Sequence, residues 1–134
     1  TYKPLGKEGK GSISTETGAL ANQPYGFNTR FKEGKGTNPE ELIGAAHASC
    51  FTMALSFALS EAGYDDGELN TTAKISLDKN DDGYEISQSA LTLDASVEGI
   101  SEDEFANIAQ EAKENCPVSQ LLDTKITLEF TLNQ

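Results

Sequence analysis

Apolar and polar residues alternate along three stretches of the chain, and this period of two is typical of strands with one buried face. The alternating apolar positions are Ala73, Ile75 and Leu77, then Tyr84 and Ile86 followed by Leu91, Leu93, Ala95 and Val97, and finally Ile126, Leu128, Phe130 and Leu132. The second stretch changes parity, so we expect a β-bulge between residues 87 and 90. Turn-forming residues at 80–83 predict a hairpin between the first two strands.

The segment from residue 11 to residue 31 predicts shorter strands. Turn-forming residues occur at 15–18, with the sequence TETG, and again at 23–26, with the sequence QPYG. We expect a turn at both places because Gly and Pro favour turn geometry.

A long helix is predicted to begin at Asn38 and to run to about Ala62. Asn38 is a good N-cap and Pro39 suits the first helical position, while Glu41 has the spacing of a capping box. Gly63 is a natural residue just beyond the helix end. Residues 42–60 carry no formal charge, so this helix needs cover on all sides, and a second copy of the chain is an expected part of that cover.

A second helix is predicted to begin with a capping box at Ser101 and Glu104. Its buried stripe is Phe105, Ile108, Ala109 and Ala112, which recur at helical spacing. The order is therefore strands, helix, strands, helix and strand. This order predicts an α+β fold with antiparallel sheet, and the 134 residues correspond to a single domain, 1–134.

The charge of the chain narrows the function classes. Ten Lys and Arg against 22 Asp and Glu give a net charge of −12, so we expect neither nucleic acid nor an anionic membrane surface as a partner.

Residues 42–60 are long enough to span a bilayer, but their Gly, Ala, Ser and Thr content favours a buried soluble helix. The polar start of the chain and its two cysteines indicate a cytoplasmic protein without a disulfide framework.

The two cysteines are the first candidates for chemistry. Cys50 lies inside the long helix, where a small buried hydrophobe is the alternative interpretation. Cys116 precedes Pro117, which we expect to open a short helix through Leu122. A sulfur at a helix N-terminus meets amide dipoles that favour the thiolate. Their separation excludes a CxxC motif but permits contact in three dimensions.

Two unique residues add further candidates. Arg30 is the only arginine and His47 the only histidine. The planar guanidinium could pair with Glu40 or Glu41 and still face a thiolate, although a surface arginine is the alternative. His47 lies three positions before Cys50, which makes a Cys–His acyl-transfer dyad conceivable; a hydrogen-bonded structural histidine is the alternative. No ligand spacing predicts a metal site, and no motif predicts a nucleotide or other cofactor.

At these residues the chain resembles the OsmC/Ohr family, which comprises osmotically induced protein C and the organic hydroperoxide resistance proteins. The resemblance is carried by residues 38–51, NPEELIGAAHASCF, and residues 116–119, CPVS. It continues in residues 23–31, QPYGFNTRF, which resembles the OsmC branch.

The resemblance implies a thiol peroxidase that reduces organic hydroperoxides to alcohols. Cys50 matches the peroxidatic cysteine, Cys116 the resolving cysteine, Arg30 the arginine that holds the thiolate, and Glu40 the glutamate that pairs with the arginine. The family forms intertwined homodimers in which antiparallel sheets wrap around long central helices. A Cys50–Cys116 disulfide would be reopened by a dithiol reductant, with lipoyl-type dithiols among the candidates. Apolar neighbours such as Phe51 and Met53 would then favour an organic peroxide.

Two other classes of function stay open from the sequence. A Cys–His hydrolase or acyltransferase would use Cys50 and His47 and would give Cys116 no role. A non-enzymatic stress protein that binds apolar ligands would leave both cysteines unreactive.

Overall fold

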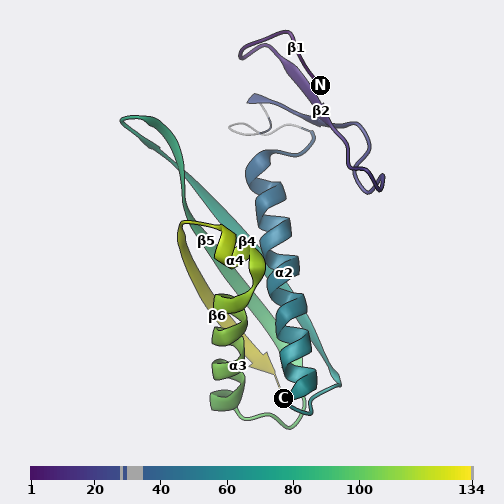
Figure 1. Ribbon diagram of the computed structural model, residues 1–134, viewed down its shortest axis with the longest axis vertical. Coiled ribbons are helices and arrows are strands. Elements are labelled where there is room, and N and C mark those ends of the chain that lie inside the picture. The colour runs from purple at the N-terminus through teal and green to yellow at the C-terminus, as the bar shows by residue number, and fades with distance from the viewer. Residues whose placement is uncertain (28, 30–34, 134) are drawn as a thin grey trace. The chain divides into compact units, whose positions relative to one another are not determined.

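The computed structural model describes residues 1–27, 29 and 35–133 of the chain. Residues 1–42 and 43–134 pack as two compact units, and each is described by itself (Figure 1). Arg30 lies outside the described residues.

The N-terminal unit holds a three-stranded antiparallel sheet of β1 (Tyr2–Lys3), β2 (Lys10–Ile13) and β3 (Gln23–Tyr25), in the order β1-β2-β3. Gly11 in β2 pairs with both Tyr2 and Tyr25. The ring of Tyr25 crosses this glycine so closely that an added Cβ would lie 2.4 Å from a ring carbon. The missing side chain at Gly11 therefore lets the rings of Tyr2 and Tyr25 approach to a centroid distance of 5.9 Å.

One of the two turns predicted in this unit is confirmed and the other is wrong. The amide of Gly18 donates to the carbonyl of Thr15 at 3.0 Å, as in a β-turn. The predicted turn at 23–26 is instead the strand β3, in which Pro24 pairs with Ser12. β3 is an edge strand, and an edge position tolerates proline because its missing N–H has no neighbouring strand to serve.

The C-terminal unit is built on a second three-stranded sheet. Its elements are α2 (Pro39–Glu61, whose first residues belong to the N-terminal unit), β4 (Gly67–Asn80), β5 (Gly83–Val97), α3 (Glu102–Asn115), α4 (Pro117–Leu121) and β6 (Lys125–Asn133). The strand order is β4-β5-β6. β4 and β5 form an antiparallel hairpin, whereas β6 runs parallel to β5. The predicted α+β fold and its antiparallel pairs are thus confirmed, with one parallel pair added.

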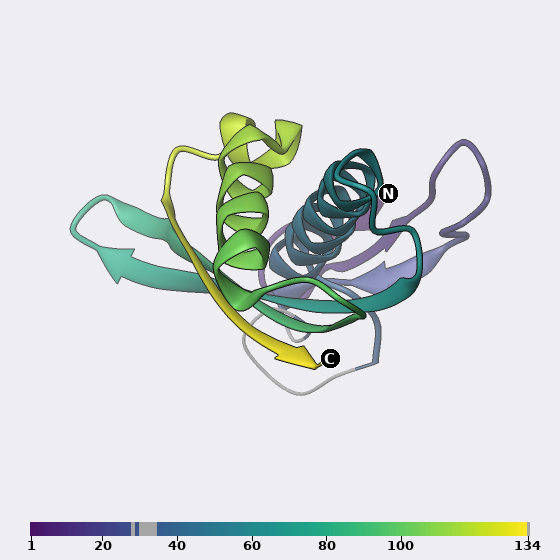
Figure 2. The ribbon, with the colours of Figure 1, turned by 90° about the horizontal axis from the view of Figure 1, so that it is seen from below.

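The helices α2 and α3 lie on the same face of this sheet (Figure 2). The core between them is apolar: it consists of Phe51, Leu55 and Leu59 from α2, Leu91, Leu93, Ala95 and Val97 from β5, Phe105, Ala109 and Ala112 from α3, and Ile100 and Cys116. Alternate residues of β5 are buried and exposed, as the sequence predicts. Cys116 is therefore part of the hydrophobic core and is shielded from water.

The N-cap and the C-terminal glycine predicted for α2 are confirmed. The side chain of Asn38 accepts from the amide of Glu41 at 2.8 Å, as an N-cap does. The Glu41 carboxylate accepts from the Thr37 hydroxyl at 2.7 Å and not from the Asn38 amide, so the reciprocal bond of the predicted capping box is wrong. At the other end Gly63 has a φ of 97°, and the amides of Gly63 and Tyr64 donate back to carbonyls of the last turn, which is a Schellman motif.

The predicted β-bulge is present at Ser87. Ser76 in β4 pairs with Gln88, whereas the next residue, Leu77, pairs with Ile86. Ser87 is therefore the additional residue of β5, and it moves the apolar side chains that follow onto the face that carries the helices.

One face of α2 is apolar and exposed within the single chain. Met53 is 55% and Phe57 63% exposed, and Ala45, Ala46, Ser49 and Ser56 are exposed on neighbouring turns. The helix has the length and the mean hydropathy, 1.6, of a membrane span, and 28% of that stretch is buried within the single chain. Large exposed apolar patches mark interaction surfaces, so this face is a candidate for cover by another subunit.

Candidate functional site

The structure brings the two cysteines into contact. Cys50 lies in the middle of α2 and Cys116 at the junction of α3 and α4. Both are free thiols; Cys50 is half-buried and Cys116 is fully buried, and the two side chains lie close enough for each to shift the pKa of the other. This is the contact in space that the sequence permits but cannot show.

Cys116 ends one helix and begins the next. Its amide donates to the Ala112 carbonyl at 3.0 Å at the end of α3, and it is the N-cap residue of α4, with Pro117 in the first turn as predicted. The side chain makes no cap hydrogen bond. Burial acts to raise the pKa of the Cys116 thiol, but the amides of Ser119 and Val118 and the side chains of Cys50 and Ser119 together lower it.

The pKa of Cys50 moves in the opposite direction. Burial raises the pKa of the Cys50 thiol, and the neighbouring Cys116 raises it further, while the Val118 amide lowers it in part. Among the described residues, negative charge in this pair is therefore best stabilised on Cys116. A positive group that acts on Cys50 has to come from elsewhere if Cys50 is to react as a thiolate.

His47 is a structural partner of two serines and not of Cys50. Its Nδ1 lies 2.6 Å from Oγ of Ser89 in β5, and its Nε2 lies 2.8 Å from Oγ of Ser119 in α4. The ring is fully buried, and burial lowers the pKa of His47 below its usual value. Both ring nitrogens are thus engaged, which fits the structural interpretation of this histidine and disfavours the Cys–His dyad.

The other predicted site residues have different positions. Glu40 lies in the first turn of α2 and is buried, while Arg30, its expected partner, lies outside the described residues. Phe51 is fully buried in the core, and its expected influence on the choice of peroxide stays a prediction. Met53 is 55% exposed and is free to line a binding surface. The described part of the chain has no group of three or more His, Cys, Asp or Glu side chains arranged to hold a metal ion.

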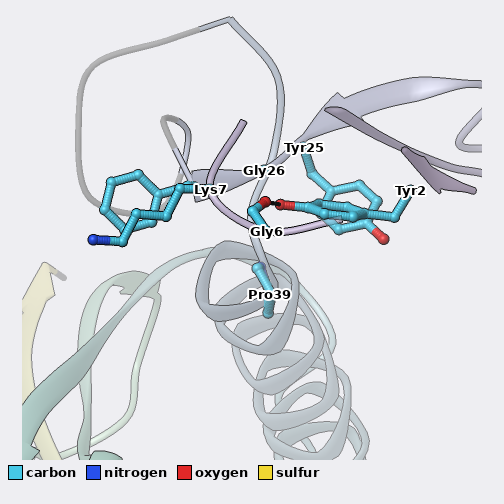
Figure 3. A pocket seen from close by; sticks show the side chains of 7 residues that line it. Tyr2, Gly6, Lys7, Tyr25, Gly26 and Pro39 are labelled. Atoms are coloured by element: carbon cyan, nitrogen blue, oxygen red, sulfur yellow. Dashed lines mark hydrogen bonds between the residues drawn. The ribbon is translucent and has the colours of Figure 1, made fainter. Parts of the chain in front are cut away.

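The N-terminal unit contains a cavity of about 440 Å³, lined by Tyr2, Gly6, Lys7, Tyr25, Gly26, Phe27 and Pro39 (Figure 3). The Tyr2 hydroxyl donates to the Gly6 carbonyl at 2.9 Å and closes one wall. The Lys7 ammonium lies 5.4 Å from the centre of the Phe27 ring, within cation–π distance. The cavity is therefore aromatic with one cationic group, which suits an apolar ligand with a polar or anionic end.

Sequence reasoning missed Ser89 and Ser119 as members of the site. Ser119 follows Cys116 by three residues in a predicted helix, which is a weak signal that the two side chains are close. Ser89 carries no such signal because it is 42 residues from His47 and reaches it only through the packing of α2 on β5.

The comparisons with known proteins agree with this architecture. Residues 32–131 match the family described as "OsmC-like protein". The chain is 57% identical over 126 residues to peroxiredoxin OsmC of Escherichia coli, a match that covers 94% of this chain and 88% of the relative. It is 32% identical over 102 residues to an organic hydroperoxide resistance protein-like protein of Staphylococcus aureus, covering 75% of this chain and 72% of the relative.

Solved structures share the fold. An OsmC-like protein from Vibrio cholerae has a TM-score of 0.75 at 17% identity, covering 91% of this chain and 84% of its own. The organic hydroperoxide resistance protein OhrB of Bacillus subtilis has a TM-score of 0.69 at 24% identity, covering 99% and 98%. With the match over residues 32–131 and the identity to peroxiredoxin OsmC, these likenesses show that the chain belongs to the OsmC family.

Proposed function

We propose that the protein is a thiol-dependent peroxidase that reduces organic hydroperoxides to alcohols. The names of its relatives, peroxiredoxin OsmC and organic hydroperoxide resistance protein, support a peroxidase role in general. The observation that carries the proposal is the contact between the half-buried Cys50 and the buried Cys116 at the start of α4. Two thiols in contact, one accessible and one shielded, are suited to a cycle through a sulfenic acid and a disulfide.

In the first step the Cys50 thiolate attacks the distal oxygen of the hydroperoxide. The O–O bond breaks, the sulfur becomes a sulfenic acid, and the alkoxide leaves and takes a proton to become the alcohol. Cys50 fits this role better than Cys116 because its side chain is partly exposed, whereas that of Cys116 is fully buried. Sulfur is oxidised by two electrons and the peroxide is reduced by two.

Arg30 and Glu40 complete this step in our proposal. Burial raises the pKa of Cys50, so a thiolate there needs a nearby positive charge. The guanidinium of Arg30 would supply that charge and stabilise the negative charge that develops on the peroxide oxygens. The carboxylate of Glu40, which is buried in the first turn of α2, would hold the guanidinium in a bidentate pair.

In the second step Cys116 resolves the sulfenic acid. Its thiolate attacks the Cys50 sulfur, hydroxide leaves and is protonated to water, and the Cys50–Cys116 disulfide forms. A dithiol reductant then returns two electrons and reopens the disulfide. The lowered pKa of Cys116 favours both events, because it supplies the attacking thiolate and later a good leaving group.

We further propose that the active protein is a homodimer. The exposed apolar face of α2, with Met53 and Phe57 at its centre, is the surface that a second copy would cover. Sedimentation at micromolar concentration should give twice the 14.3 kDa chain mass. A fully active, folded species of 14.3 kDa would reject the dimer.

The test of the peroxidase compares single cysteine variants. Cys50→Ser should abolish peroxide consumption, whereas Cys116→Ser should complete about one turnover and then stall with an overoxidised Cys50. Ser96→Ala is the control, since it removes an exposed hydroxyl of β5 away from the two cysteines and should keep full activity. Sustained dithiol-dependent turnover in Cys50→Ser would overturn the assignment.

The two other function classes predict different results. A hydrolase that uses Cys50 and His47 would form an ester-derived thioester on Cys50 and would not need Cys116. Its geometry is disfavoured because both nitrogens of His47 are held by Ser89 and Ser119. A non-enzymatic binding protein could use the aromatic cavity of the N-terminal unit, but its thiols would not react with stoichiometric peroxide.

A further inference from the structure

A row of buried polar side chains runs through the C-terminal unit to the resolving cysteine. Ser89, His47 and Ser119 are all buried, and the imidazole joins the two hydroxyls at 2.6 and 2.8 Å. Ser119 lies in the first turn of α4, three residues after the N-cap residue Cys116, and its side chain is close enough to that thiol to lower the pKa of Cys116. Ser89 comes from β5, His47 from α2 and Ser119 from α4. We call these three hydrogen-bonded side chains the relay.

The number of protons in the relay limits which groups can donate and which must accept in its hydrogen bonds. A neutral imidazole has one N–H donor and one acceptor nitrogen, and a serine hydroxyl has a single proton to donate. Burial lowers the pKa of His47 and so favours the neutral form of the ring. The hydroxyl of Ser119 can therefore donate either to Nε2 of His47 or to the sulfur of Cys116, but not to both.

The charge on Cys116 decides between the two arrangements. When Cys116 is a thiolate, the Ser119 hydroxyl donates to the sulfur, Nε2–H of His47 donates to Ser119, and Ser89 donates to Nδ1. When Cys116 is a thiol, the Ser119 hydroxyl is released to donate to Nε2, and the imidazole proton is on Nδ1, where it is donated to Ser89. The two states differ in the tautomer of a single ring.

We propose that His47 is a positioning residue for the resolving cysteine: through Ser119 it directs a hydroxyl proton to the Cys116 sulfur, and its tautomer changes with the charge on that sulfur. The inference rests on the proposed function, in which Cys116 resolves the sulfenic acid. It adds a role for the one histidine of the chain, which the proposed peroxide step does not use.

The relay acts in the part of the cycle where Cys116 is charged. During reduction, a thiolate of the dithiol attacks the more accessible Cys50 sulfur, the S–S bond breaks, and Cys116 leaves with the electron pair. The second thiol of the reductant then displaces Cys50 and forms the reductant's own disulfide. A leaving thiolate that receives a hydrogen bond departs faster, so the relay should speed disulfide opening and leave the peroxide step little changed.

The surroundings of the relay are suited to this coupling. Among the described residues, the titratable groups in contact with it are the thiol of Cys116 and, through that thiol, the thiol of Cys50. Burial is the cause of the lowered pKa of His47. In so dry an environment the polarity of one hydrogen bond orients the next, because neighbouring bonds polarise each other.

The direct test is nitrogen NMR of the reduced chain labelled with ¹⁵N. Since the chain has one histidine, its side chain gives one pair of ring nitrogen signals, and their shifts report the tautomer. A Cys50→Ser background leaves Cys116 as the single thiol, and ultraviolet absorbance follows its ionisation. We expect the Nε2–H tautomer to become populated over the same pH range in which the Cys116 thiolate forms.

Variants of the relay test its effect on Cys116 in that background. Ser119→Ala should leave about ten- to a hundredfold less thiolate at a given pH below the transition, as expected for one lost hydrogen bond to a charged group. His47→Gln, which can keep a donor near the Nε2 position, should retain more thiolate than His47→Leu. Ser96→Ala, an exposed serine of the same strand as Ser89, is the control and should leave the ionisation unchanged.

Two results would overturn the inference. One is an imidazole tautomer that stays constant while Cys116 titrates. The other is a normally folded Ser119→Ala protein whose Cys116 ionises as in the parent. Neither measurement involves a peroxide, so the relay can fail while the peroxidase proposal stands, and the loss of turnover in Cys50→Ser tests that proposal separately.

Discussion

Replacement of Phe57 by alanine should weaken the proposed dimer without unfolding the chain. The side chain of Phe57 is 63% exposed within one chain, so its removal takes little from the core. Full burial of a phenylalanine side chain contributes about 1.5–3 kcal/mol, and the exposed part of Phe57 therefore has about 1–2 kcal/mol left to gain from a partner. A symmetric interface contains two copies of this side chain. The free energy of dimerisation should therefore weaken by ~2–4 kcal/mol, which raises the dissociation constant by about 30- to 700-fold.

Sedimentation over a concentration series measures this constant directly. Glu61→Ala is the matched control, because it truncates an exposed side chain at the end of the same helix and removes no large apolar surface. If Phe57→Ala, the Glu61→Ala control and the parent protein all have the same dissociation constant, Phe57 does not lie in the dimer interface. A loss of thermal stability in dilute, monomeric Phe57→Ala would also count against this prediction, because an exposed side chain should not support the core.

Three further predictions concern the catalytic charge, the packing of α2 and the buried histidine. Arg30→Lys should lower peroxidase kcat/KM by roughly ten- to a hundredfold because lysine keeps the charge but loses the planar fork. Glu40→Gln should lower kcat/KM less. Equal activity of Arg30→Lys and the parent would argue against a role of the guanidinium in catalysis. Gly44→Ala should lower the stability in chemical denaturation by a net ~1–2 kcal/mol, because its Cβ would lie 3.1 Å from the carbonyl oxygen of Ala73 and this crowding is only partly offset by about 1 kcal/mol of helix propensity. A raised midpoint would show that β4 moves to accommodate the methyl group. Burial lowers the pKa of His47 in the folded state from 6.5, so the unfolded chain binds a proton at higher pH than the folded chain does. The free energy of unfolding should therefore fall as the pH drops below about 6.5. His47→Gln should lack this part of the pH dependence.

The local features of the fold could be predicted from the sequence. Asn38 accepts a hydrogen bond at the start of α2 and Gly63 closes its end, because capping depends on residues a few positions apart. The bulge at Ser87 was predictable for a similar reason. A change of parity in a buried strand has to be compensated within that strand.

Strand direction and the strand at Pro24 could not be predicted in the same way. The alternation of apolar residues in β6 is the same whichever way the strand runs, so the pattern does not distinguish the observed parallel pairing with β5 from an antiparallel one. Pro24 has the local chemistry of a turn, and it lies in a strand because that strand is at the edge of its sheet.

The candidate site was predictable in its residue types and less so in its contacts. The two cysteines could be identified from their positions in the helices, but their contact depends on the packing of α2 against the α3–α4 junction. The partners of His47 lie 42 and 72 residues away along the chain, beyond any local pattern. The charge that would act on Cys50 stays a prediction, because Arg30 lies outside the described residues.

The mass of the intact protein after one equivalent of cumene hydroperoxide tests the central claim most directly. The account predicts the loss of two hydrogen atoms, formation of one molecule of cumyl alcohol per chain, and a peptide map in which Cys50 is joined to Cys116. Unmodified thiols after the peroxide is mixed in, or a stable thioester on Cys50 with an ester substrate and no change at Cys116, would contradict it.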